Sequence, residues 1–191
     1  MEKIYTDRQL QIMKESLHLL NEKGVGGLTI KNLAKRLELT EGAIYRHFVS
    51  KEEILGAIAD HYRQESLKVL NSIQKDSLSN KDKLQEFFLS RAQLFENNRE
   101  LAIVVISVEF GKTAYRVREI LDRLIEQHKA ELQKIIKKAC ANGELRQDIR
   151  TESLFRMIFG SLRFLVYRWH LSEYSFSLKG QAVELWRDLD T

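Results

Sequence analysis

The side chains best suited to chemistry in this chain lie within residues 29–48, where hydroxyl, basic and small residues are concentrated. Ile44 and Phe48 are four residues apart and predict the buried side of a helix over residues 41–48. The outward positions of this segment are small, polar or basic: Thr40, Glu41, Gly42, Ala43, Tyr45, Arg46 and His47. Side chains of these kinds can bind phosphate oxygens or approach the edges of bases, which is the chemistry of DNA recognition.

A short helix that precedes residues 41–48 in the chain has to hold the helix over these residues in place. Thr29 is a natural N-cap, and the apolar side chains that follow it share one helical face: Ile30, Leu33, Ala34 and Leu37. Three residues, 38–40, separate the two predicted helices, and Leu39 can anchor this turn in the core. Two short helices at this spacing are typical of a helix-turn-helix, in which one helix braces and the next enters the major groove.

Helical periodicity extends over the rest of the chain, which has no proline and no sustained alternation of period two. A first helix over residues 6–22 is capped by Thr6 and followed by a turn rich in glycine. Ser50 begins a fourth helix with the spacing of a capping box, and this helix extends as far as residue 75. Further helices are predicted over residues 82–97, 99–110, 115–141, 151–171 and 178–189. The predicted fold is all-α, with a three-helix head at residues 1–50 and a helical body at residues 51–191.

Two stretches of the head carry a distinctive motif, residues 28–34 (LTIKNLA) and residues 42–55 (GAIYRHFVSKEEIL), of which IYRHF-x-SKEEIL is the most specific part. These stretches resemble the DNA-binding domain of TetR-type bacterial regulators. The strong resemblance covers about 50 residues, and beyond them only the helical character and the length match. It implies a sequence-specific DNA-binding transcriptional regulator, a repressor rather than an enzyme, with double-stranded operator DNA as its partner.

The resemblance also implies roles for individual residues. Phosphate contacts fall to Thr29, Tyr45, His47 and Lys51, whereas Thr40, Glu41, Gly42 and Ala43 face base edges. Arg46 can reach either a phosphate or a guanine, and Glu41 can accept a hydrogen bond from cytosine or simply complement the helix dipole.

The predicted turn contains one departure from the family. The family usually has glycine where this chain has Glu38. A left-handed backbone would cost a residue with a side chain roughly 1 kcal/mol. We therefore expect the turn to be built slightly differently here.

Two predicted helices of the body carry more apolar surface than a single core covers. Residues 115–141 have an apolar face between charged residues, and residues 151–171 are apolar over most of their circumference. The resemblance implies a homodimer formed through these two segments, with Gly160 and Ser161 allowing close approach. Two heads can then match two operator half-sites.

A pocket for a small-molecule effector is a further implication of the resemblance. The candidate lining residues are aromatic or apolar and lie on helices in the middle of the body: Tyr62, Phe88, Phe95, Val105, Phe110, Tyr115 and Trp169. Such residues are more often core than pocket, so both interpretations stay open. We expect an apolar or amphipathic ligand that favours a dimer with splayed heads and so weakens DNA binding.

The distribution of charge agrees with a DNA-binding head on a neutral body. Residues 1–51 hold nine Lys/Arg and six Asp/Glu, whereas the other 140 residues hold 22 and 21. The lone Cys140 cannot form a disulfide framework, and the most apolar run, residues 101–108, is too short to span a bilayer. With no signal peptide evident, we expect a cytoplasmic protein without a membrane partner.

No catalytic residue, metal site or cofactor is predicted. The five histidines lack metal-ligand spacing, and Gly111-Lys112-Thr113 lacks the first glycine and the preceding strand of a phosphate loop. The alternative to a ligand-released repressor is a DNA-binding protein that acts through a protein partner without a small-molecule effector. An exposed apolar patch in place of an internal cavity would favour that alternative. A helical enzyme is a third hypothesis, and it requires titratable groups that converge on a cavity.

Overall fold

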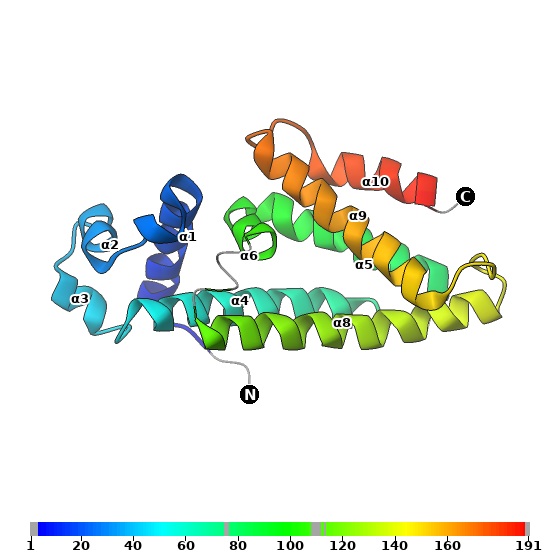
Figure 1. Ribbon diagram of the computed structural model, residues 1–191, viewed down its shortest axis with the longest axis horizontal. Coiled ribbons are helices and arrows are strands. Elements are labelled where there is room, and N and C mark those ends of the chain that lie inside the picture. Colours follow the sequence, from blue (N-terminus) through cyan, green and yellow to red (C-terminus); the bar gives the residue numbers. More distant parts are fainter. Residues whose placement is uncertain (1–3, 75–76, 108–111, 113, 190–191) are drawn as a thin grey trace. The chain divides into compact units, whose positions relative to one another are not determined.

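The computed structural model of the chain describes residues 4–74, 77–107, 112 and 114–189, and in these residues all regular structure is helical. This confirms the all-α prediction. The helices labelled in Figure 1 are listed in chain order: α1 (Asp7–Gly27), α2 (Ile30–Arg36), α3 (Glu41–Tyr45), α4 (Lys51–Ser72), α5 (Asn80–Asn97), α6 (Ala102–Ile106), α8 (Tyr115–Ala141), α9 (Thr151–Leu171) and α10 (Leu178–Leu189). A short 3-10 helix, η1 (Arg99–Leu101), precedes α6.

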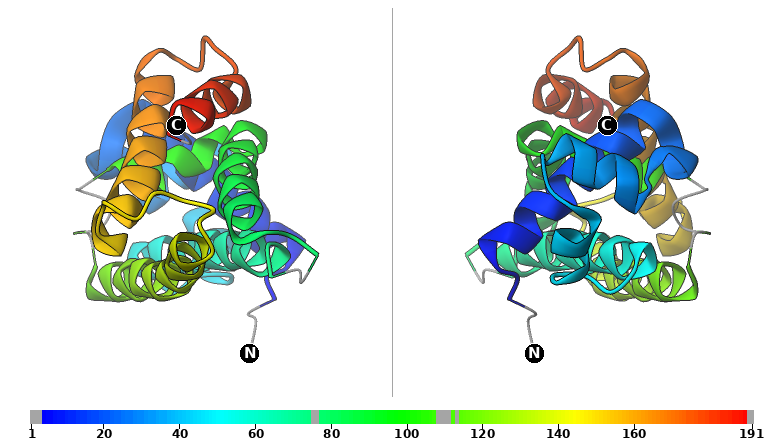
Figure 2. Two further views of the ribbon diagram at one scale, coloured as in Figure 1. Left: turned by 90° about the vertical axis from the view of Figure 1, so that its right-hand side faces the viewer. Right: turned by 90° about the vertical axis from the view of Figure 1, so that its left-hand side faces the viewer.

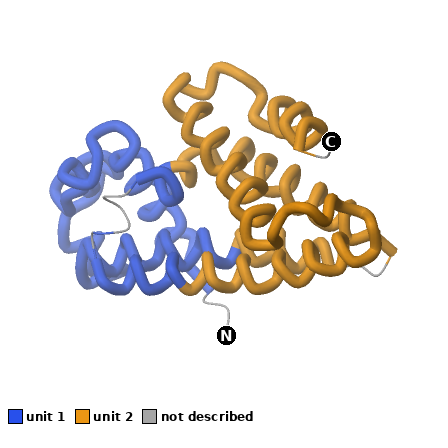
Figure 3. Tube along the Cα trace, turned by 45° about the vertical axis from the view of Figure 1, so that its right-hand side comes forward, with its two compact units in different colours: residues 1–64, 103–122 blue, residues 65–102, 123–191 orange. Residues whose placement is uncertain are grey.

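The chain divides into two compact units, which Figure 3 distinguishes by colour. Unit 1 comprises residues 1–64 and 103–122, and unit 2 comprises residues 65–102 and 123–191. Helices α4 and α8 contribute to both units. They run alongside one another in the same direction (Figure 1), with Gly56 facing Arg116 in unit 1 and Ser66 bonded to His128 in unit 2.

Unit 1 contains the three-helix head, and its helix ends follow from local signals. Thr6 caps α1 in a capping box with Gln9, as its hydroxyl accepts from the Gln9 N–H and the Gln9 side chain accepts from the Thr6 N–H. The predicted break after residue 22 lies at Gly24, whose φ of 65° interrupts the helix before it resumes to Gly27. The core of the head is closed by side chains with almost no exposed surface: Ile12, Leu20, Leu28, Leu33, Ile44, Phe48 and Ile54.

Unit 2 is a helical body in which α5 packs against both α9 and α10 (Figure 2). The predicted bounds of α8, α9 and α10 are confirmed. Gly143 follows the end of α8 with a φ of 72°, the left-handed conformation that commonly terminates a helix. Of the predicted helix over residues 99–110, the structure shows η1 and α6, and residues 108–111 lie outside the described residues.

Some predicted bounds were wrong, among them the start of α5, which is Asn80 rather than residue 82. The helix predicted over residues 41–48 ends at Tyr45 and continues as a turn, which still buries Phe48. The fourth helix ends at Ser72 rather than at residue 75.

Candidate nucleic-acid interface

Threonine hydroxyls fix the start of both helices in the helix-turn-helix. The Thr29 hydroxyl accepts a hydrogen bond from the Asn32 N–H at 3.1 Å, and the Thr40 hydroxyl accepts one from the Ala43 N–H at 3.2 Å. Both residues are exposed. Because a hydroxyl that accepts can still donate its own proton, each exposed cap residue retains a hydroxyl donor at a helix N-terminus.

The turn between α2 and α3 is left-handed at Glu38, whose φ is 56°. The Leu39 N–H bonds the Ala34 carbonyl at 2.9 Å and the Glu38 N–H bonds the Lys35 carbonyl at 3.3 Å. These two bonds define a Schellman motif, the geometry that normally selects glycine. The expectation that this turn would be built differently is therefore wrong, since Glu38 adopts the conformation that glycine would have.

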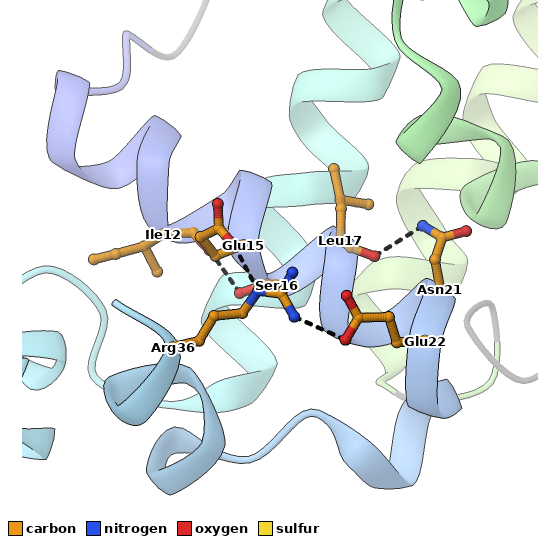
Figure 4. A network of polar contacts seen from close by, with 7 residues as sticks. All are labelled: Ile12, Glu15, Ser16, Leu17, Asn21, Glu22 and Arg36. Carbon is orange, nitrogen blue, oxygen red and sulfur yellow. Dashed lines mark hydrogen bonds and ion pairs between the residues drawn. The ribbon is translucent and has the colours of Figure 1, made fainter. Parts of the chain in front are cut away.

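An ion-pair network braces α2 against α1 (Figure 4). Arg36 lies 2.6 Å from Glu15 and 2.8 Å from Glu22, and these hydrogen bonds lower the pKa of Glu22 and raise that of Arg36. All three side chains are partly solvated, so the network contributes orientation more than stability. Asn32 adds a bond to the Gly27 carbonyl at 2.9 Å, which joins α2 to the end of α1.

Helix α3 separates its side chains into two sets. Ile44 has no exposed surface, whereas Thr40, Glu41, Gly42, Tyr45 and Arg46 are exposed and Ala43 is half-buried. The Tyr45 side chain is 48% exposed, which is unusual for a large ring unless something else covers it. The predicted base-facing residues and Tyr45 are therefore accessible on the outside of α3, whereas Thr29 lies at the start of α2, Lys51 at the start of α4, and His47 is half-buried beyond the end of α3.

Two predicted phosphate ligands also have structural partners. The His47 carbonyl accepts from the Gln9 side chain at 3.3 Å, which ties the end of α3 to α1. Lys51 Nζ donates to the Val25 carbonyl at 2.9 Å, just after the break at Gly24. Glu53 accepts from the Val49 N–H, while Ser50 caps the Glu53 N–H. Ser50 and Glu53 thus have the predicted capping-box spacing, but the carboxylate accepts from the N–H of Val49, one residue before the cap, instead of that of Ser50.

The predicted effector residues are distributed over both units. In unit 2, the ring of Phe88 is tilted against that of Trp186 with centroids 5.5 Å apart, whereas Trp169 donates to the Phe176 carbonyl and meets Tyr174 edge-on. In unit 1, Tyr62 is buried and Val105 is half-buried, but Tyr115 is 82% exposed and so does not face the interior.

The remaining effector candidates are Phe95, which is buried beneath the Arg91 guanidinium, and Phe110, which lies outside the described residues.

A buried polar cluster in unit 2 was missed by the sequence reasoning. It consists of Ser66, Arg91 and His128, one each from α4, α5 and α8. Each residue occupies an apolar stripe at helical spacing, as Arg91 does after Leu84 and Phe88. A polar residue on a buried stripe is the signal that could have found the cluster.

The described residues hold no group of three His, Cys, Asp or Glu able to bind a metal ion. Across the same part of the chain, we find no helix that is both long and apolar enough to cross a bilayer.

A bracing helix, a left-handed turn and a second helix with an exposed polar face together define a helix-turn-helix DNA-binding protein. Residues 12–58 match the model of the bacterial regulatory proteins of the tetR family, and residues 51–189 match the model of the YsiA-like protein C-terminal region. The chain therefore belongs to the TetR family, and it is a DNA-binding transcriptional regulator.

Three relatives illustrate the similarity. The fatty acid metabolism regulator protein of Bacillus subtilis (strain 168) is 21% identical over 171 residues, which are 90% of this chain and 88% of that protein. The structure of FadR from Bacillus subtilis in complex with stearoyl-CoA matches with a TM-score of 0.75 at 20% identity, over 95% of this chain and 97% of that one. The structure of AibR in complex with isovaleryl coenzyme A and operator DNA matches with a TM-score of 0.79 at 18% identity, over 94% and 96%.

Proposed function

We propose that this protein is a homodimeric repressor that binds operator DNA through α2 and α3 and is released by an acyl thioester. The observation that carries the proposal is the outer surface of α3, which exposes Tyr45 and Arg46 while Ile44 anchors the helix in the core. In this proposal residues 1–50 act as the DNA-binding domain and residues 51–191 as the effector-binding and dimerisation domain.

Gly42 supports the assignment of the base-reading surface. A Cβ placed on Gly42 would meet nothing closer than the Thr40 hydroxyl at 4.0 Å, so packing within the protein does not require glycine there. Glycine in a helix costs about 1 kcal/mol relative to alanine. A close approach of DNA gives the missing side chain a reason, with Thr40, Glu41 and Ala43 beside it at the base edges.

Phosphate contacts flank this surface. The hydroxyl protons of Thr29 and Tyr45 can donate to phosphate oxygens. Arg46 and His47 follow directly after α3, the helix that carries Tyr45. Lys51 gives one N–H to the Val25 carbonyl, but an ammonium carries three donors and can bind a phosphate at the same time.

The outer face of α9 supports the homodimer. Its large side chains are exposed at heptad spacing: Met157, Phe164, Tyr167 and Leu171. Gly160 lies on the same stripe, and a Cβ there would meet no atom within 4 Å. The opposite face of α9 is fully used by the core of unit 2. A second copy that packs its own α9 here would cover the stripe, and Ile125 of α8 and Val183 of α10 are further exposed apolar side chains of unit 2.

The relatives support the class of effector. One structural neighbour holds stearoyl-CoA and another holds isovaleryl coenzyme A together with operator DNA. The two ligands share a coenzyme A thioester and differ in their acyl chains. An amphipathic thioester also fits the expectation of an amphipathic ligand for a body rich in aromatic residues.

The test is a selection of bound sequences from random double-stranded DNA with the full-length protein, followed by mobility-shift assays of the selected site with and without acyl-CoA. We expect a palindromic site, as a two-fold dimer requires, and its release by acyl-CoA but not by coenzyme A alone. A selected site that no acyl-CoA releases would favour the alternative of a protein partner. No selected site at all would overturn the proposal.

A further inference from the structure

Three polar side chains of unit 2 are buried where α4, α5 and α8 meet. Ser66 and His128 have no exposed surface, and Arg91 is 4% exposed. Burying a polar or charged group costs several kcal/mol unless hydrogen bonds replace those to water. The fold therefore holds these residues inside at a cost that simple apolar packing would avoid.

The hydrogen bonds of this cluster run in one direction. His128 Nδ1 lies 2.8 Å from the Leu124 carbonyl, which can only accept, so Nδ1 carries the proton and Nε2 is an acceptor. The Ser66 hydroxyl lies 3.1 Å from Nε2 and therefore donates to it. Arg91 in turn donates from Nη1 to the Ser66 oxygen. Burial, and then the charge of Arg91, lower the pKa of His128 to about 4, which keeps the ring neutral at pH 7.

Aromatic rings surround this chain of bonds. The Arg91 guanidinium lies 5.3 Å from the centre of the Phe95 ring, and the Phe87 ring lies 5.7 Å from His128. The ring of Phe159, on α9, lies 6.2 Å from the ring of His128. A fixed cation inside an aromatic wall suits a molecule that joins a polar oxygen to a hydrocarbon chain.

We propose that Arg91 is the polar anchor of the effector, donating hydrogen bonds to the acyl carbonyl oxygen while the rings of Phe87 and Phe95 contact the first carbons of the acyl chain. The proposal rests on the acyl thioester effector proposed above. Ser66 and His128 act as positioning residues, because the Ser66 oxygen, itself oriented by His128, holds Nη1 of the guanidinium. The guanidinium offers donors in a rigid fork, which suits a carbonyl or carboxylate oxygen better than an ammonium would.

The chemistry explains why one kind of site can serve acyl chains of different length. Stearoyl and isovaleryl thioesters have in common coenzyme A and the carbonyl next to its sulfur, and of these shared groups the carbonyl is the one joined directly to the acyl chain that the aromatic rings would contact. A free fatty acid offers an oxygen of the same geometry with a negative charge. An acyl thioester and a free fatty acid can both accept hydrogen bonds from Arg91, so the experiment has to distinguish these two ligands.

The experiment is calorimetric titration of the full-length protein with stearoyl-CoA, isovaleryl-CoA, coenzyme A alone and sodium isovalerate. Arg91→Met keeps the length of the side chain and removes its donors and charge. We expect it to weaken acyl-CoA binding about tenfold or more, because a hydrogen bond to a charged group is lost. Operator binding without ligand should stay unchanged. Lys137→Met, which removes one exposed charge from α8, controls for the anionic character of coenzyme A and should leave ligand affinity unchanged.

A second variant and a spectroscopic signal cover the case in which Arg91→Met fails to fold. Ser66→Ala removes the acceptor that orients Arg91 and should weaken acyl-CoA binding about threefold. In the wild-type protein, the ring proton signals of His128 should shift when acyl-CoA binds. Ligand affinity that is unchanged in Ser66→Ala, together with unshifted His128 signals, would overturn the proposal.

The outcomes separate this inference from the function on which it rests. If the wild-type protein binds its operator but no acyl compound, the proposed effector and the anchor both fail. If acyl-CoA binds and releases the operator while Arg91→Met binds it equally well, the anchor alone fails. Binding of coenzyme A alone that depends on Arg91 would assign the residue to phosphate and overturn the carbonyl contact. Isovalerate binding that depends on Arg91 would support the anchor with a free acid as the source.

Discussion

The head and the body of this protein place their polar side chains in opposite ways. In the head, Thr40, Tyr45 and Arg46 lie outside, next to helix ends that local caps define. In the body, Ser66 and His128 lie inside with no exposed surface. A surface that reads DNA has to display its donors, whereas a domain that encloses a small ligand has to bury them. The difference explains why the head is recognisable from a short motif and the body is not.

The largest effect on operator affinity is expected from a change in the exposed apolar stripe of α9 in the body. Phe164→Glu places a charge in the middle of the α9 stripe, at a side chain that is 63% exposed in the single chain. If two copies bury this stripe, the charge should separate them and remove the gain from binding two half-sites, so operator affinity should fall about 100-fold. Sedimentation velocity and mobility-shift assays on one preparation measure both quantities.

Gln147→Glu is the matched control, since it adds the same charge at an exposed position between α8 and α9. It should leave the dimer and its DNA affinity intact. A Phe164→Glu variant that remains dimeric would place the interface elsewhere and leave the α9 stripe open to another protein.

The buried cluster predicts a dependence of stability on pH. The folded pKa of His128 is about 4, below the ordinary value of 6.5 that the unfolded chain retains. Between these two values the unfolded state binds the proton more strongly, so the contribution to stability is complete above pH 6.5 and is lost as the pH falls toward 4. Lowering the pH from 7 to 5 should therefore cost about 2 kcal/mol through this residue.

Urea unfolding of the wild-type protein and of His128→Leu at both pH values isolates that contribution. The variant should be less stable at pH 7, because it loses the bond to Ser66, and its stability should change less on acidification. Equal changes in the two proteins would mean that His128 does not titrate between its folded and unfolded values in this range.

The fold followed from the sequence wherever local signals were complete. The bounds of α8, α9 and α10 were predicted because apolar periodicity ran uninterrupted between turn residues such as Gly143. The end of α3 was not predicted, since Ile44 and Phe48 keep helical spacing although the chain leaves the helix after Tyr45. Periodicity records which side chains are buried, and a turn can bury Phe48 as well as a helix can.

The candidate site divides in the same way. Exposure of Thr29, Tyr45 and Arg46 followed from the pattern of the head, because it depends on which face two short helices present. The cluster around Arg91 depends on three helices that are distant in sequence, and no single helix contains the signal. Tyr115 shows the converse error, since an aromatic residue at the first turn of α8 was expected to face inward and is 82% exposed.

Removal of phosphate contacts in the head is expected to weaken DNA binding by an intermediate amount that does not depend on the DNA sequence. Tyr45→Phe removes one donor and should weaken binding to selected and random DNA alike by several-fold, up to about tenfold. Lys51→Ala should do the same and reduce the slope of log affinity against log salt by about one. Because Lys51 also holds the Val25 carbonyl, this variant should lose some stability in urea as well.

Lys68→Ala serves as the control, because Lys68 is an exposed lysine on the same helix as Lys51 but lies in unit 2. It should leave the affinity and the salt slope as they are. Gly42→Ser should instead change which sequences are bound, because it adds a side chain at the base-facing surface. Wild-type binding in the Tyr45 and Lys51 variants would remove the phosphate roles from these residues.

The smallest predicted effect comes from one kind of turn, which follows α2 in the head and follows both α8 and α9 in the body, where Glu173 after α9 has a φ of 54°. Glu38 after α2 and Gly143 after α8 occupy the same position of a Schellman motif, with φ of 56° and 72°. The turn after α8 has the same two bonds as the turn after α2, from the Glu144 N–H to the Ala139 carbonyl at 2.8 Å and from the Gly143 N–H to the Cys140 carbonyl at 3.1 Å.

A residue with a side chain costs roughly 1 kcal/mol of stability in this left-handed conformation, and glycine avoids that cost. Glu38→Gly should therefore raise the free energy of unfolding by about 1 kcal/mol, and Gly143→Ala should lower it by a similar amount, because its Cβ would meet no atom but would strain the backbone. Operator affinity should change in neither variant, as Glu38 lies outside the base-facing residues 40–43. If Glu38→Gly destabilises the head or weakens DNA binding, the glutamate contributes a contact that offsets its strain.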